Sequence, residues 1–144
     1  MTMEELYKEL SSLYPNVNKT NVIGIENEWN GIYVIFGDSS VSIQCTPYHY
    51  CNLRKFEPVS VTTTDANAKS VLWRNTAIDA EILIIVEGRE LEDKEPLSYV
   101  RFDKALEYVK NVYDYTTKKT EHLILEGKVV FLEGDPNIDM EKVL

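Results

Sequence analysis

Residues 32–45 read IYVIFGDSSVSIQC, and this stretch decides the fold. It predicts two strands, at residues 32–36 and 41–45, joined by a turn at Gly37-Asp38-Ser39-Ser40. Polar and apolar residues alternate strictly in the second strand, so every other side chain should be buried. Those expected on the buried face are Val41, Ile43 and Cys45.

Two elements are predicted upstream of this hairpin. Val22–Ile25 predicts a strand, and Asn30-Gly31 is the dipeptide that favours a type I′ turn, so we expect a three-stranded meander. Residues 3–14 predict a helix from their apolar spacing. Thr2 and Glu5 form a capping box at its start, and Pro15 ends it.

The middle of the chain is less regular. Val59 and Val61 alternate with polar residues and indicate a strand. Asp65 is placed to cap a short helix through Leu72, although residues 70–73 could equally be extended. Residues 81–86 are apolar on both faces, which predicts a central strand, and Gly88 to Pro96 reads as a charged loop.

The last third predicts a helix, a hairpin and a short helix. Residues 102–115 carry one apolar stripe at helical spacing. Residues 122–125 and 128–132 should pair through Glu126-Gly127, and Asp135-Pro136 begins a final helix. The sequence therefore predicts a single α+β domain over residues 1–144. We expect a largely antiparallel sheet of five to seven strands, with an N-terminal meander, a C-terminal hairpin and two or three helices packed on it.

The charge and composition narrow the function classes. The net charge is −9, and residues 73–144 contribute −6 of it. A field of this sign repels phosphate, so we expect no direct nucleic-acid binding and a protein partner with a basic surface. No apolar run is long enough to span a bilayer and no secretory signal is evident, so we expect a cytoplasmic protein that does not bind membranes.

The sequence offers no convincing catalytic or metal site. Cys45, His49, Cys51 and His122 are the complete set of thiols and imidazoles, and their spacing matches no familiar zinc motif. A disulfide between the two cysteines is disfavoured in a reducing compartment. The glycines are too dispersed to cradle a phosphate. We therefore predict no catalytic residue, no metal and no cofactor.

Asp79, followed by Glu92-x-Lys94, faintly resembles the acid pattern of metal-dependent nucleases. Glu92 and Lys94 fall in the predicted charged loop rather than on a strand, so the pattern is incomplete. A small metal-dependent hydrolase or nuclease remains an alternative function.

Two groups of residues are candidates for binding. The first is an acidic loop that could dock on a basic groove; it comprises Glu87, Glu90, Glu92, Asp93 and Glu95. The second is aromatic, because the chain has nine tyrosines. Its members are Tyr48, His49 and Tyr50 in a turn and Tyr108 and Tyr115 on the flank of the 102–115 helix.

These features favour a small acidic binding or inhibitor protein that occludes a protein partner and could do so by mimicking the charge of nucleic acid. In composition alone the chain is similar to phage anti-defence proteins and bacterial immunity proteins. A self-assembling structural protein, for example a homodimer joined through Lys128–Leu132, is a further alternative.

Overall fold

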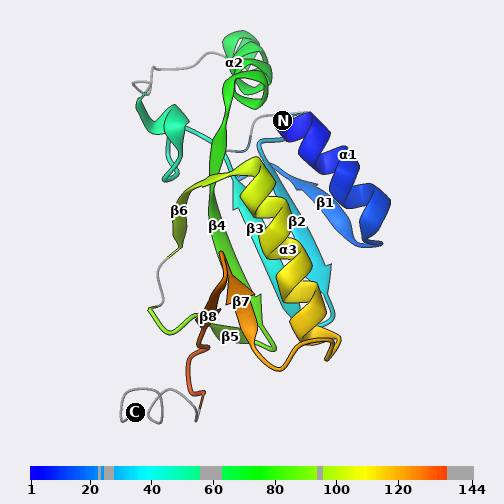
Figure 1. The fold of residues 1–144 in the computed structure, drawn as a ribbon. Helices are drawn as coiled ribbons and strands as arrows, with labels where there is room; N and C mark the ends of the chain where they lie inside the picture. The colour runs from blue at the N-terminus through cyan, green and yellow to red at the C-terminus, as the bar shows by residue number, and fades with distance from the viewer. Residues whose placement is uncertain (23, 25–27, 56–62, 94–95, 136–144) are drawn as a thin grey trace.

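The computed structural model describes residues 1–22, 24, 28–55, 63–93 and 96–135. A six-stranded antiparallel sheet forms its centre, in the order β1-β2-β3-β4-β5, with β6 also paired to β4 (Figure 1). The strands are β1 Val17–Thr20, β2 Gly31–Phe36, β3 Ser39–Gln44, β4 Asp79–Val86, β5 Arg89–Glu90 and β6 Leu97–Arg101. The predicted α+β class with a largely antiparallel sheet is confirmed.

Two helices cover one face of the sheet. They are α1 Met3–Leu13 and α3 Phe102–Thr116, and they lie side by side in Figure 1. The predicted Thr2 cap is confirmed, because the Glu5 amide donates to Thr2 Oγ1 at 3.2 Å, and the Thr2 hydroxyl donates to Glu5 Oε1 at 3.2 Å. Leu83 of β4 lies on the opposite face and is 38% exposed, whereas its neighbours Ile82 and Ile84 are buried beneath the helices.

A separate hairpin lies at the end of the sheet where β5 lies (Figure 1). Its strands are β7 Leu123–Leu125 and β8 Lys128–Val130, joined at Glu126-Gly127 as predicted. Leu132 then pairs with Leu91 and attaches the hairpin to the segment that follows β5. The predicted final helix from residue 136 lies outside the described residues.

The first strand differs from the prediction. It is β1, Val17–Thr20, rather than Val22–Ile25; Val22 is exposed outside the sheet, and Ile23 and Ile25 lie outside the described residues. The predicted turn at Asn30-Gly31 is wrong, because Gly31 lies within β2 opposite Thr20 and Gln44. A Cβ atom at Gly31 would collide with both of those side chains. Glycine is therefore needed here because the neighbouring strands bring their side chains close to its backbone, and not because of a turn.

Tight turns form instead where glutamate precedes glycine. Glu87 and Gly88 have φ of 52° and 75°, and Glu126 and Gly127 have φ of 51° and 75°, as a two-residue hairpin turn of type I′ requires. The predicted loop after Gly88 therefore begins as strand β5. The strand predicted around Val59 and Val61 lies outside the described residues.

Helix α2, Thr63–Thr76, lies at the end of the sheet where β4 begins. The helical prediction for this region is confirmed and the extended alternative for residues 70–73 is wrong. The helix starts before Asp65, so that residue is not its cap. A short 3₁₀ helix, η1 Asn52–Lys55, precedes it in the chain.

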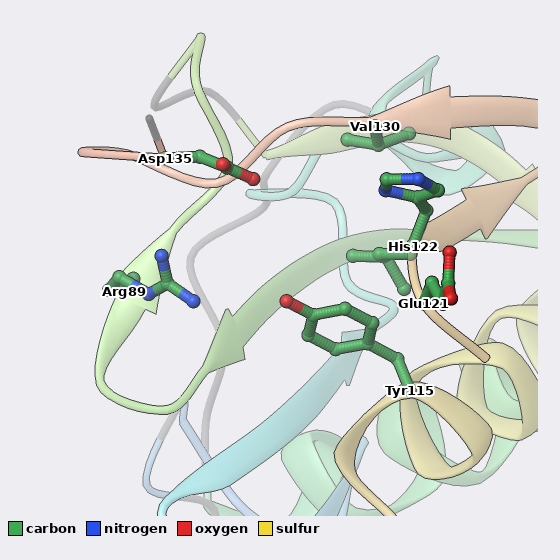
Figure 2. Close-up of a pocket in the computed structure, with 7 residues that line it drawn as sticks. Arg89, Tyr115, Glu121, His122, Val130 and Asp135 are labelled. Atoms are coloured by element: carbon green, nitrogen blue, oxygen red, sulfur yellow. The ribbon is translucent and has the colours of Figure 1, made fainter. Parts of the chain in front are cut away.

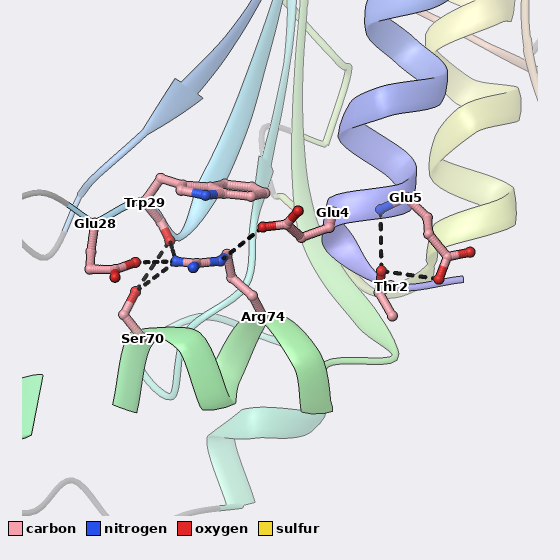
Figure 3. A network of polar contacts seen from close by, with 7 residues as sticks. All are labelled: Thr2, Glu4, Glu5, Glu28, Trp29, Ser70 and Arg74. Carbon is pink, nitrogen blue, oxygen red and sulfur yellow. Dashed lines mark hydrogen bonds and ion pairs between the residues drawn. The ribbon is translucent and has the colours of Figure 1, made fainter. Parts of the chain in front are cut away.

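A buried arginine joins α2 to the rest of the fold. Arg74 forms an ion pair with Glu28, donates to the Trp29 carbonyl oxygen at 2.9 Å and lies over the Trp29 ring at 4.9 Å (Figure 3). Its guanidinium also lies 3.9 Å from Glu4 on α1. The contacts fix α2 against α1 and the segment before β2, and therefore position the start of β4.

Candidate binding surface

The loop at residues 46–54 is built around Thr46, which is completely buried. Its hydroxyl accepts the Tyr48 amide at 3.1 Å and lies 2.6 Å from His49 Nδ1, and its carbonyl accepts the His49 amide at 3.0 Å. Burial lowers the pKa of His49 although Glu81 opposes the shift, which favours the neutral imidazole. His49 therefore acts as a hydrogen-bonding group of the turn rather than as an added positive charge.

Two carboxylates at the start of β4 fix the remainder of this loop. Glu81 Oε2 accepts the Tyr50 amide at 2.7 Å, and Asp79 Oδ1 accepts the Asn52 amide at 2.5 Å. Hydrogen bonds from main-chain amides to carboxylates are charge-assisted and short. These two acids therefore hold the backbone in place.

Strand β6 makes the third attachment. Ser98 and Tyr99 together oppose Glu81, because the register of β6 shifts by one residue there. Tyr99 has φ of 53°, a left-handed conformation typical of such a bulge, and its amide donates to the Tyr50 carbonyl oxygen at 2.8 Å. The bulge therefore aligns Tyr99 with the 46–54 loop.

The side chains of this region remain at the surface. Tyr48, Tyr50 and Tyr99 are 62%, 45% and 50% exposed. The Arg54 guanidinium lies 4.3 Å from the centre of the Tyr50 ring, and a hydrogen bond to Tyr50 helps to raise the Arg54 pKa. We call Tyr48, Tyr50, Arg54 and Tyr99 the tyrosine surface. Its backbone is anchored at three places while its rings face solvent.

The predicted acidic loop is divided by the structure. Glu87 lies in the β4–β5 turn and forms ion pairs with Lys118 at 3.0 Å and Arg89 at 3.6 Å. Glu90 is half-buried in β5, opposite Ile85. Glu92 and Asp93 are exposed beyond β5, and Glu95 lies outside the described residues.

The two tyrosines predicted on α3 differ in environment. Tyr108 is only 4% exposed, and burial together with the Glu126 carboxylate raises its pKa to about 12. Tyr115 is half-buried and projects into a pocket of about 240 Å³, where its hydroxyl points toward Arg89 (Figure 2). The rest of the lining comprises Glu121, His122, Leu123, Val130 and Asp135.

The four thiols and imidazoles of the possible zinc site do not come together as one set. Cys45 contacts the first residue of β4, whereas His122 lines the Tyr115 pocket beyond the other end of that strand. Asp79 accepts a main-chain amide, Glu92 follows β5, and Lys94 lies outside the described residues. In the described part of the chain no three His, Cys, Asp or Glu side chains are grouped to hold a metal ion.

The edge proposed for self-assembly, Lys128–Leu132, already forms some hydrogen bonds within the chain. The Glu92 amide donates to the Phe131 carbonyl oxygen at 2.9 Å, and the Glu133 amide donates to that of Glu90 at 2.7 Å. Residues 131–133 are thus bonded within the chain. No described helix has both the length and the apolar character needed to cross a membrane.

Sequence reasoning identified Tyr48 and Tyr50 but missed Arg54 and Tyr99. Arg54 lies four residues after Tyr50, but Tyr50 precedes the helix η1, so no helical spacing in the sequence indicated their contact. Nothing local indicates the β6 bulge that places Tyr99 beside them. No protein-family model, curated protein or solved structure matches this chain.

Proposed function

We propose that this chain is a protein-binding module that acts by covering a surface of its partner, with the tyrosine surface as the central contact. The supporting observation is that Tyr48, Tyr50 and Tyr99 expose their rings on a backbone fixed by Glu81 and Asp79. Tyrosine and arginine dominate the energetic centres of protein interfaces, and tyrosine loses little conformational entropy on binding.

The charge of the chain indicates the kind of partner. A net charge of −9 favours a partner with a basic surface, since long-range attraction accelerates the encounter. The exposed acids Glu92 and Asp93 are suited to this steering role, while the aromatic rings supply the buried contact. In this proposal the protein is a cytoplasmic inhibitor of immunity or anti-defence type, and its action requires no cofactor.

The experiment is an affinity capture with matched baits from the cells that make this protein. The test variant is Tyr48→Ala/Tyr50→Ala/Tyr99→Ala. The control is Leu13→Ala/Ile124→Ala, which removes exposed apolar side chains from α1 and β7 instead. We expect one basic protein to be retained by the wild type and by the control but not by the test variant.

The captured protein is then purified and its affinity for each bait is measured by calorimetry at low and high salt. Binding that weakens with salt supports electrostatic steering. Equal affinity of the wild type and the tyrosine variant would contradict the proposal, as would a partner with an acidic surface. Circular dichroism of each bait confirms that the substitutions leave the fold intact.

A further inference from the structure

The two cysteines are buried next to each other at the ends of one loop. Cys45 directly follows β3 and Cys51 directly precedes η1. The Cys45 thiol donates to the Asp79 carbonyl oxygen at 3.0 Å, and the Cys51 thiol donates to that of Thr46 at 3.1 Å. Each thiol also shifts the pKa of the other. The fold has therefore already brought both sulfurs together.

The backbone between them is held in this arrangement. The Cys51 amide donates to the His49 carbonyl oxygen at 2.8 Å, and the Asn52 amide donates to the Asp79 carboxylate. Much of the entropy that would be lost on joining the two sulfurs is thus lost already on folding. A bond between them closes a loop that is already formed.

The surroundings give the two sulfurs different roles. The interaction with Cys45 and the amides of Leu53 and Arg54 lower the pKa of Cys51, against the effects of burial and of the Asp79 carboxylate. The pKa of Cys45 is raised by its interaction with Cys51, by burial and by the nearby Asp79 carboxylate. Cys51 is therefore the sulfur that ionises first, and Cys45 keeps its proton.

We propose that Cys45 and Cys51 are a redox pair that closes to an intrachain disulfide in reaction with a small organic disulfide such as oxidised glutathione. The Cys51 thiolate attacks one sulfur of the oxidant, the oxidant's S–S bond breaks, and one glutathione thiolate leaves. Cys45 then gives its proton to the released glutathione thiolate and attacks the Cys51 sulfur of the mixed disulfide. The bond between Cys51 and glutathione breaks, and the second glutathione leaves as a thiolate. Two protein thiols lose two electrons and the oxidant gains them.

The disulfide would act on the loop that carries the tyrosine surface. When it forms, the hydrogen bonds from the two thiols to the carbonyl oxygens of Asp79 and Thr46 are lost. A covalent bond between residues 45 and 51 takes their place. Because both sulfurs are buried, the oxidant reaches Cys51 when the loop opens. The inference concerns the thiols alone and stands whether or not the tyrosine surface binds a protein.

The test is the equilibrium between the full chain and glutathione at a fixed ratio of its oxidised and reduced forms. Samples are quenched with iodoacetamide, and intact mass distinguishes two alkylated thiols, a glutathione adduct and a disulfide. The same measurement is made in urea at a concentration that unfolds the chain. We expect the equilibrium constant for disulfide formation to be at least about tenfold larger in the folded chain.

The Cys45→Ser variant separates the two steps. It should accumulate a glutathione adduct at Cys51, whereas the wild type should pass through this adduct to the disulfide. An equal or smaller equilibrium constant in the folded chain than in urea would overturn the proposal. So would a wild-type chain that stops at the mixed disulfide.

Discussion

The carboxylates at the two ends of β4 bind different kinds of partner. At the start of the strand, Glu81 and Asp79 bind main-chain amides, so the 46–54 loop is fixed and its tyrosine rings remain exposed. At the other end, Glu87 binds the side chains of Arg89 and Lys118, so its charge is compensated within the chain. A carboxylate that binds backbone leaves neighbouring side chains free to bind a partner, whereas one that binds side chains uses them itself.

The largest effect is expected from removing the anchor at the start of β4. Asp79→Ala leaves the half-buried Asn52 amide without its acceptor, and an unpaired donor costs about 1–3 kcal/mol when it is buried from water. We expect the free energy of unfolding, measured by urea titration, to fall by that amount. Asp79→Asn is the matched control, because it keeps an acceptor oxygen and should lose less. Wild-type stability in Asp79→Ala would show that other contacts hold the loop.

Tyr108 extends the comparison to a tyrosine that is not available for binding. Its pKa is raised to about 12, so the folded state favours the protonated phenol. This contribution is complete below the ordinary tyrosine pKa of about 10 and is lost as the pH rises toward 12. We expect the free energy of unfolding, measured at about pH 9, 10 and 11, to fall more steeply for the wild type than for Tyr108→Phe. An equal fall in the free energy of unfolding for both proteins would contradict a raised pKa of Tyr108.

The smallest effect is expected at the acidic end. Glu87→Gln removes the ion pairs with Arg89 and Lys118, which are partly exposed, so the free energy of unfolding should fall by less than about 1 kcal/mol. The loss should disappear at high salt. Glu9→Gln on α1, an exposed acid without an ion pair in the described part of the chain, is the control. A loss that persists at high salt would mean that Glu87 has a structural role.

Local signals predicted much of the fold. The Thr2 cap of α1, the alternation of β3 and the Glu126-Gly127 turn each depend on residues within a few positions of one another. The prediction placed the first strand wrongly because Asn30-Gly31 is typical of a turn, whereas in the structure Gly31 lies within β2. Asn30 is buried and bonded to Asn21, and Gly31 makes room for Gln44 on the next strand. That requirement is visible only once the strands are paired.

The tyrosine surface was likewise predictable only in part. Tyr48 and Tyr50 were identified because they lie in one short turn. The acid that fixes Tyr50 lies 31 residues away, at Glu81, and Tyr99 is aligned with the loop only through the β6 bulge. Contacts of this range depend on strand register, which the sequence of either segment does not contain.

The most direct test compares the two ends of β4 against one purified partner by surface plasmon resonance. Tyr48→Ala/Tyr50→Ala/Tyr99→Ala removes the rings, and Glu90→Lys/Glu92→Lys/Asp93→Lys reverses the acids. We predict that the tyrosine variant raises the dissociation constant by at least about 100-fold, mainly through faster dissociation, as loss of an interface centre does. The acid reversal should mainly slow association. A tyrosine variant that binds like the wild type, beside an acid variant that does not bind, would contradict the account.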